Sequence, residues 1–382
     1  MNIVIAIDSF KGSLSSLDAG NAAAEGIRRV FPDAKIAVRP LADGGEGTVE
    51  AIAAGLGGTM HTIAVTGPLG RPVKASYCIV GNLAVIEMAA AAGLPLVPAE
   101  ARNPLHTTTY GVGELILDAI ANGCRDFIIG IGGSATNDGG TGMLAALGFR
   151  FTDASGNPVP LGAKGLASLA QIDASGANPA LRACRFRVAC DVKNPLCGES
   201  GCSAVYAPQK GADAAMIRDM DAWLEAFAAL TKTVFHDADA EFPGAGAAGG
   251  MGFALREYLG GELVSGVSLV LDATRLDDYV RASDIVITGE GRIDAQTAMG
   301  KAPGGVAAAA KKFGKPCFAF AGSVTDDARA CNTVGADGGV IDAFFPIRRN
   351  ICTLSEAMEP SRAASELADT AEQVFRVIKA LR

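Results

Sequence analysis

Short β-branched runs alternate with helical segments from one end of this 382-residue chain to the other. The first unit consists of a strand predicted over Ile3–Ile7, a polar loop, and an alanine-rich helix predicted over Leu17–Val30. Ser15 and Asp18 have the spacing of a capping box at the start of that helix. Because parallel strands are joined by helical crossovers, the alternation predicts an α/β architecture with parallel sheets.

The middle of the chain differs from its two ends. Longer loops and several proline breaks lie between the terminal α/β patterns. The C-terminal part again has strand-like runs, Asp284–Thr288, Pro316–Ala321 and Gly339–Ile341, and a closing helix predicted over Leu354–Leu381. We therefore predict a discontinuous α/β domain made from residues 1–66 and 283–382, and a second α/β domain, residues 67–282, inserted between them.

One glycine-rich stretch, Gly130–Gly142, carries the clearest functional signal. A buried-strand pattern ends in a loop of glycines, hydroxyls, an amide and one carboxylate, and a helical pattern follows at Met143–Leu147. Backbone N–H groups in such a loop can approach an anion, and a helix start adds its positive dipole end. The stretch therefore predicts binding of phosphate or carboxylate. The alternative is a set of tight turns without a ligand, because the chain has 48 glycines.

Composition excludes several classes of protein. With a net charge of −8 and no basic run, the chain is not expected to bind nucleic acid or an anionic membrane surface. The nine cysteines are scattered, none forms a C-x-x-C pair, and there are three histidines. This pattern favours free thiols over disulfides or a zinc site. The N-terminal apolar run stops at Asp8, as a first strand does and a signal peptide does not, so we expect a cytoplasmic protein.

Charged residues follow other predicted strands, where ligands bind in open α/β sheets. Asp8 and Lys11 follow the first strand, and Asp43 lies in a Gly-Gly-Glu-Gly loop after the second. Arg71 lies in a turn, and its planar guanidinium suits a carboxylate. Asp191 follows a predicted strand at Phe186–Cys190 and could accept a proton. Solvated loops and helix caps remain the alternatives for these residues. Lys210 and Lys301 lie in flexible settings, where a lone lysine is more often solvated than functional.

Familiar nucleotide motifs fail on context. Gly244–Gly249 satisfies G-x-G-x-x-G but follows no clear strand, and Gly130–Ala135 lacks the acidic residue expected about 20 positions later. The chain has neither a G-x-x-x-x-G-K-[ST] loop nor protein-kinase signatures. Any nucleotide chemistry must use another cradle.

The motifs in order along the chain nevertheless resemble one family, the bacterial glycerate kinases of the first type. The resemblance extends from end to end and rests on Asp8–Ser15, Pro40–Thr48, Thr66–Pro72, Thr107–Gly111, Gly130–Gly140, Cys190–Val192, Pro208–Gly211, Gly244–Gly250, Thr288–Asp294 and Gly300–Lys301. It implies a flavodoxin-like domain with an inserted second domain and an active site in the cleft between them. It also implies ATP-dependent phosphorylation of D-glycerate, at the 2-hydroxyl in most members.

The resemblance and the residue chemistry together suggest roles for individual residues. Asp191 would be the proton acceptor in an in-line phosphoryl transfer, and Lys11 would neutralise anionic charge. Asp8, Asp43 and Arg71 would bind the substrate. Glu290 or Asp294 would reach Mg²⁺. The phosphates of ATP would contact the glycine-rich loop through Gly132, Gly133, Ser134, Asn137, Asp138 and Gly139.

Two other functions remain open at this point. A dinucleotide-dependent oxidoreductase would use Gly130–Ala135 as its fingerprint, and a non-catalytic sensor would bind a hydroxy acid without ATP turnover. Neither accounts for the whole series of motifs. The sequence indicates a small-molecule substrate, leaves a homodimer open as the assembly, and decides neither the enantiomer nor the pathway.

Overall fold

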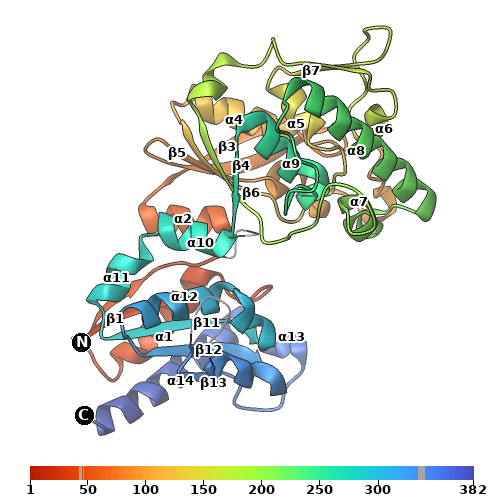
Figure 1. Ribbon diagram of the computed structural model, residues 1–382. Helices are drawn as coiled ribbons and strands as arrows, with labels where there is room; N and C mark the ends of the chain where they lie inside the picture. The colour runs from red at the N-terminus through yellow and green to blue at the C-terminus, as the bar shows by residue number, and fades with distance from the viewer. Residues whose placement is uncertain (43–44, 46, 334–339) are drawn as a thin grey trace. The chain divides into compact units, whose positions relative to one another are not determined.

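The computed structural model describes residues 1–42, 45, 47–333 and 340–382. The chain separates into two compact units (Figure 1). The first contains Met1–Asp43, Glu50–Gly57 and Val267–Arg382, and the second contains Gly44–Val49 and Gly58–Gly266. The chain changes unit four times: after Asp43, after Val49 within α2 (Thr48–Leu56), after Gly57, and after Gly266 at the start of α10 (Gly266–Ala273).

The first unit is built on a parallel five-stranded sheet in the order β13-β12-β11-β1-β2. Counted within this unit alone, the order is 2-1-3-4-5, which is the flavodoxin order. The strands are β1 (Asn2–Ile7), β2 (Lys35–Val38), β11 (Ile285–Ile293), β12 (Cys317–Val324) and β13 (Ala343–Pro346). The predicted parallel α/β domain made from both chain ends is therefore present.

Helices cover both faces of this sheet. α1 (Ser16–Arg28) and α14 (Pro360–Ala380) pack on the face that carries Ile3, Ile5 and Ile7. α11 (Leu276–Ala282) and α12 (Ala302–Lys312) contact β1 and β11. Because the strand order reverses between β1 and β11, right-handed crossovers place α1 and α12 on opposite faces. The unit also contains α13 (Leu354–Ala357) and two 3-10 helices, η5 (Ala295–Met299) and η6 (Asp326–Asn332).

The second unit has a mixed sheet rather than the parallel one predicted. Its order is β10-β9-β6-β5-β4-β3, and the pairs β3–β4 and β4–β5 are antiparallel. The strands are β3 (Thr59–Thr66), β4 (Pro72–Val80), β5 (Leu83–Glu87), β6 (Asp126–Gly130), β9 (Arg185–Ala189) and β10 (Glu262–Val264), with a separate hairpin of β7 (Arg150–Thr152) and β8 (Gln171–Asp173). Short loops between β3, β4 and β5 leave no room for helical crossovers, so these strands pair antiparallel.

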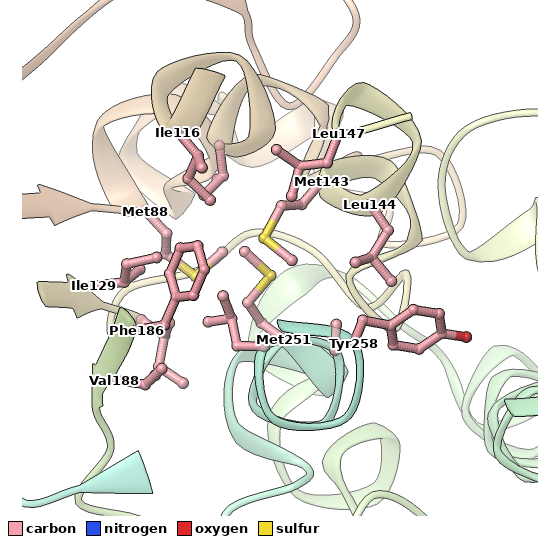
Figure 2. Packing of buried hydrophobic residues seen from close by; sticks show 14 of the residues in the cluster. Met88, Ile116, Ile129, Met143, Leu144, Leu147, Phe186, Val188, Met251 and Tyr258 are labelled. Carbon is pink, nitrogen blue, oxygen red and sulfur yellow. The ribbon is translucent and has the colours of Figure 1, made fainter. Parts of the chain in front are cut away.

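Helices and one large apolar core complete the second unit. The helices are α3 (Ala89–Ala92), α4 (Tyr110–Ala121), α5 (Thr141–Ala146), α6 (Ala163–Leu166), α7 (Cys202–Tyr206), α8 (Ala214–Val234) and α9 (Ala247–Leu259), with short 3-10 turns η1 (Leu94–Leu96), η2 (Ala99–Ala101), η3 (Pro179–Ala183) and η4 (Pro208–Lys210). Figure 2 shows Met143 of α5 and Met251 of α9 between Ile129 and Phe186 of the sheet and Ile116 of α4. Unbranched methionine side chains fill the irregular space that these elements leave.

The boundaries of the units differ from those predicted at 66/67 and 282/283. Residues 58–66 belong to the second unit because β3 pairs with β4 along its whole length. Residues 267–282 belong to the first, because α11 packs on β1 and α12 and Val267 of α10 lies against Gly305 of α12. Strand pairing and helix packing, which composition does not reveal, decide both boundaries.

Three local expectations also need correction. The strand predicted over Asp284–Thr288 is longer, since β11 continues to Ile293 and pairs with β12 through Val324. Residues 340 and 341 are not strand, and β13 begins at Ala343. The closing helix is divided into α13 and α14 because Pro360 starts a new helix, which Glu359 caps.

None of the helices within the described residues is both long and apolar enough to cross a membrane. All nine cysteines are free thiols, and five of them are buried.

Candidate functional site

A cavity of about 830 Å³ lies in the first unit, at the carboxyl ends of its strands. Its lining comes from the loop after β1, the C-terminal parts of β11 and β12, the residues that follow β11, and the segment that follows β13. The strand order reverses between β1 and β11, and open α/β sheets bind ligands at such a point. Four residues predicted for the site, Asp8, Lys11, Glu290 and Asp294, line this cavity together.

The loop after β1 brings Asp8 and Lys11 to the cavity. Asp8 is 8% exposed, and its carboxylate accepts a hydrogen bond from the backbone N–H of Ser9 at 2.7 Å. The loop then turns at Gly12, whose φ is +76° and against which Met358 packs. Lys11 is exposed, and its positive charge weakly opposes the rise that burial causes in the pKa of Glu290. A tight loop therefore places one carboxylate and one ammonium at the same strand end.

Glu290 and Asp294 come from the extended end of β11 and the residue that follows it. Burial raises the pKa of Glu290, and a hydrogen bond from the Thr297 hydroxyl at 2.6 Å opposes that rise. Asp294 caps η5 and accepts a hydrogen bond from Lys301 Nζ at 3.3 Å. The described residues contain no cluster of three or more His, Cys, Asp or Glu side chains that could hold a metal ion. Two carboxylates without a third protein ligand suit a Mg²⁺ ion that also binds substrate phosphates.

Two cations in the cavity were not among the predicted site residues. Lys301, expected to be an ordinary solvated lysine, lines the cavity beside Asp294. Arg292 lines it too, with its Nε 4.0 Å from Asp294 Oδ2. Arg292 comes directly after the sequence Thr-Gly-Glu-Gly of β11, and Lys301 follows nine residues later. Their place after a buried strand was the sequence feature that could have identified them as site residues.

The other part of the cavity lining is mainly apolar, although it also includes Arg348 and Asn350. It comes from the segment between β13 and α14 and includes Ile347, Ile351, Leu354, Ala357 and Met358. Ile351 and Leu354 are among the most exposed large hydrophobic side chains of the described chain, at 106% and 75%. The cavity lining is therefore charged along β1 and β11 and mainly apolar beyond β13.

In the second unit, the predicted glycine-rich loop follows β6 directly. Gly132 and Gly133 are exposed, and Gly133 has a φ of +72°. Ser134 is 8% exposed and pairs with Gly93 through an isolated bridge. Only this first part of the loop lies at the surface.

Asp138 is the centre of a buried hydrogen-bond network behind that surface. Its carboxylate accepts hydrogen bonds from the Thr109 N–H and hydroxyl, both at 2.9 Å, and from the N–H groups of Gly140 and Gly142. Burial raises the pKa of this carboxyl, and these hydrogen bonds oppose the rise. The first N–H groups of α5 all have internal acceptors, since Thr141 donates to the Asp138 carbonyl and Met143 to the Thr109 hydroxyl. This helix start differs from the anion-binding one expected from the sequence.

Asn137 and Gly139 are buried too. Asn137 donates to the Ser203 hydroxyl at 2.9 Å. Gly139 donates to the carbonyl of Gly249 at 2.9 Å, and a Cβ at Gly249 would lie 2.2 Å from the carbonyl oxygen of Thr136. The Gly244–Gly250 cluster thus permits close packing of α9 on this loop, which explains its glycines without a dinucleotide.

Lys210 was expected to be solvated, but it is 2% exposed. Its Nζ donates to the Ser134 hydroxyl at 2.9 Å and to the Thr136 carbonyl at 2.6 Å. Burial lowers the pKa of Lys210 to about 8, and the nearby charges of Cys202 and Asp138 oppose that shift. Lys210 therefore supports the glycine-rich loop from beneath.

Three of the predicted site residues remain, namely Asp191, Arg71 and Asp43. Asp191 follows β9, is exposed, and accepts a hydrogen bond from the Gly266 N–H at 3.1 Å. Arg71 is exposed in the turn between β3 and β4. Asp43 lies outside the described residues.

Comparisons with known proteins place the chain. Residues 3–379 match the glycerate kinase family. This chain belongs to the glycerate kinase family. An Escherichia coli K12 protein named glycerate 2-kinase is 50% identical over 97% of this chain and 98% of its own length. A glycerate kinase of Halalkalibacterium halodurans is 48% identical over 96% of both chains.

A solved structure agrees with this assignment. A crystal structure from Salmonella typhimurium LT2, of a protein assigned as glycerate kinase 2, superposes with a TM-score of 0.90 and 47% identity, covering 100% of this chain and 98% of that one. The chain is therefore an enzyme of a kinase family, and the oxidoreductase and sensor hypotheses give way to it.

Proposed function

We propose that this enzyme transfers the γ-phosphoryl group of ATP to the 2-hydroxyl of D-glycerate, producing 2-phosphoglycerate and ADP. The observation that carries the proposal is the end-to-end identity of 50% with a protein named glycerate 2-kinase. The charged cavity at the carboxyl ends of β1 and β11 supports it, because a phosphorylated ligand needs cations at such a point.

The proposed reaction is a direct in-line displacement. The glycerate hydroxyl oxygen forms a bond to the γ-phosphorus, while the bond from that phosphorus to the bridging oxygen breaks and ADP leaves with the electron pair. The hydroxyl proton passes to Asp191, whose exposed carboxylate at the end of β9 can act as general base. The Gly266 N–H holds one of its oxygens at 3.1 Å, which orients the group. Most of the catalysis would come from positioning and charge neutralisation.

Four further residues keep the roles that the motifs suggest, namely Lys11, Arg71, Asp8 and Asp43. Lys11 and Arg71 are exposed cations that would contact phosphate or carboxylate groups. Asp8 lines the cavity beside Lys11, where its carboxylate would accept a hydrogen bond from a substrate hydroxyl. Binding of substrate hydroxyls by Asp43 stays a prediction, as does an active site formed by both units.

Within the glycine-rich loop we divide the predicted phosphate contacts. Gly132 and Gly133 are exposed, so their N–H groups are the candidates for direct contact with phosphate. Ser134, Asn137, Asp138 and Gly139 are buried and hydrogen-bonded within the protein. We propose that these four act by holding the loop in shape.

Mg²⁺ would be held by Glu290 and Asp294. Both are acidic and both line the cavity; Glu290 accepts from the Thr297 hydroxyl through Oε1, and Asp294 accepts from the Gln296 N–H and Lys301 Nζ through Oδ1. When bound, the ion would neutralise charge on the phosphates. Lys11, Lys301 and Arg292 would supply the rest of the positive charge from the protein itself.

The test is ADP release from ATP–Mg²⁺ with D-glycerate, with the product identified by phosphorus NMR. We expect glycerate-dependent ADP and the signal of 2-phosphoglycerate. A signal of 3-phosphoglycerate would support the kinase activity but would show that the 3-hydroxyl, not the 2-hydroxyl, is the acceptor. Folded protein that releases no ADP with D- or L-glycerate would overturn the proposal.

A further inference from the structure

The cavity of the first unit is too large for glycerate alone. Its volume of about 830 Å³ lies in the range of roughly 300–1,000 Å³ that encloses molecules of drug or nucleotide size. Its lining extends from the end of β1, past β11 and β12, to the end of β13. Three strand spacings correspond to about 14 Å, whereas the three-carbon chain of glycerate is only about 5 Å long.

The chemistry of the lining changes along that length. Near β1 and β11 it presents Lys11, Arg292 and Lys301 together with the carboxylates suited to Mg²⁺. Beyond β13 it presents mainly apolar side chains such as Ile347 and Ile351, together with Asn350 and with Arg348, which forms an ion pair with Glu366. A ligand that fits both parts has an anionic end and a flat apolar end, about a nucleotide's length apart.

One polar group in the cavity also lacks a protein partner. Ser13 Oγ is buried and lines the cavity, and it has no hydrogen-bond partner within the residues that the structure describes. Buried hydroxyls are almost always hydrogen-bonded, so a missing partner points to a ligand oxygen. Ser13 lies in the same loop as Lys11, at the charged end.

From these observations we infer that the first unit holds both ends of the nucleotide, with the phosphates between Lys11, Ser13 and Lys301 and the purine ring against Ile351, Leu354 and Ala357. The inference rests on the proposed function for the identity of the ligand as ATP or ADP. It adds that a segment with no nucleotide motif, the residues between β13 and α14, forms the base site. The glycine-rich loop of the second unit then contacts at most the phosphates.

The inference is tested by calorimetric titration of ADP–Mg²⁺ and of AMP into the full chain without glycerate. Ala357→Trp fills the apolar end, and we expect it to weaken binding of both nucleotides about 10-fold or more. Ala380→Trp, at the exposed end of α14 and outside the cavity, is the matched control and should bind as the unaltered protein does. Unchanged binding by Ala357→Trp would overturn the inference.

Further variants separate the two ends and guard against misfolding. Lys301→Met should weaken ADP about 10-fold but AMP much less, because AMP lacks the distal phosphate, and Lys311→Met on the surface of α12 should change neither. Ile351→Ser tests the base site without disturbing packing, since Ile351 is fully exposed, and should weaken both nucleotides about 3-fold. Equal binding of ADP to Lys301→Met, or of AMP to Ile351→Ser, would contradict the assignment.

Steady-state kinetics distinguish this inference from the proposed function. Ala357→Trp should raise KM for ATP and leave KM for glycerate within about 2-fold. A raised KM for glycerate with an unchanged KM for ATP would show that the cavity holds the acceptor, and would overturn the inference while the kinase stands. The protein could also bind nucleotide in a way that depends on Ala357 and yet not phosphorylate glycerate. That result would overturn the proposed function but would support the nucleotide site.

Discussion

Two glycine-rich regions of this protein look alike in sequence and differ in what their polar groups contact. In the loop after β6, Asp138 accepts four hydrogen bonds from the protein and Lys210 donates to two loop oxygens. At the end of β11, Glu290 and Asp294 face a cavity together with exposed cations. In the first region the polar groups form hydrogen bonds within the protein, whereas in the second they line a cavity where a ligand can reach them.

The comparison shows why glycine content alone does not identify a ligand site. A Cβ at Gly140 would lie 2.4 Å from the Ala254 side chain, and one at Gly142 would lie 2.3 Å from the Thr108 hydroxyl. Glycines at these positions let one segment approach another. A cradle for phosphate needs N–H groups that no side chain already occupies, and in the described part of this loop only Gly132 and Gly133 are exposed enough to offer them.

The largest effect is expected at Asp191. Asp191→Asn should lower kcat by about 10²–10⁴-fold because the proton acceptor is lost, while the amide oxygen can still accept from the Gly266 N–H and preserve the fold. Steady-state kinetics and a thermal melt measure the two properties. Asp237→Asn, an exposed residue outside both regions, is the control. Near-normal turnover would remove Asp191 from the mechanism.

The next effect is on stability and concerns Asp138. Asp138→Ala leaves the buried Thr109, Gly140 and Gly142 donors without an acceptor, so we expect the free energy of unfolding to fall by about 3 kcal/mol or more. Urea denaturation measures the loss. KM for ATP, measured on the fraction that remains folded, should change little. A stable variant with a strongly raised KM for ATP would show that Asp138 acts in nucleotide binding and not in holding the loop together.

Lys210 provides a pH test of the same buried network. Burial lowers its pKa to about 8 from 10.5, so its charged form destabilises the folded state most fully below pH 8. Between about pH 8 and 10.5, Lys210 is neutral in the folded protein but still protonated in the unfolded chain. Because the unfolded chain binds more protons in this window, the free energy of unfolding should rise with pH relative to Lys210→Met, by of order 1–3 kcal/mol. Paired melts across that window measure the difference. A difference that is constant with pH would show that Lys210 titrates normally.

Asp294 gives the smallest expected effect and the sharpest contrast with Asp138. Asp294→Asn should change the free energy of unfolding by less than about 1 kcal/mol, because an amide oxygen can still cap η5. It should raise KM for ATP–Mg²⁺ about 10-fold, equivalent to about 1.4 kcal/mol. Asp327→Asn, at the first turn of the neighbouring 3-10 helix, is the control. A large loss of stability with an unchanged KM would assign Asp294 a structural role.

Much of the fold could be predicted because local patterns decide it. The strand predicted over residues 3–7 is β1, and the helix predicted after it is α1. The predicted cap is present as well, since the Asp18 N–H donates a hydrogen bond to Ser15 Oγ. Clustering of Asp8, Lys11, Glu290 and Asp294 also followed from a general rule, since carboxyl ends of parallel strands meet at one edge. The strand character of Gly289–Arg292 could not be predicted, because glycines favour strand only when a partner such as β12 lies against them.

The sequence by itself determined the family, the α/β class and the ordered series of motifs, since these depend on residue identity and short-range periodicity. Tertiary structure alone decided which motif residues are available to a ligand. Burial of Asp138 and Lys210 depends on α9, α7 and η4 packing around the loop, and exposure of Arg292 and Lys301 depends on the cavity beside β11. Solvent exposure is a property of distant contacts, and no local pattern encodes it.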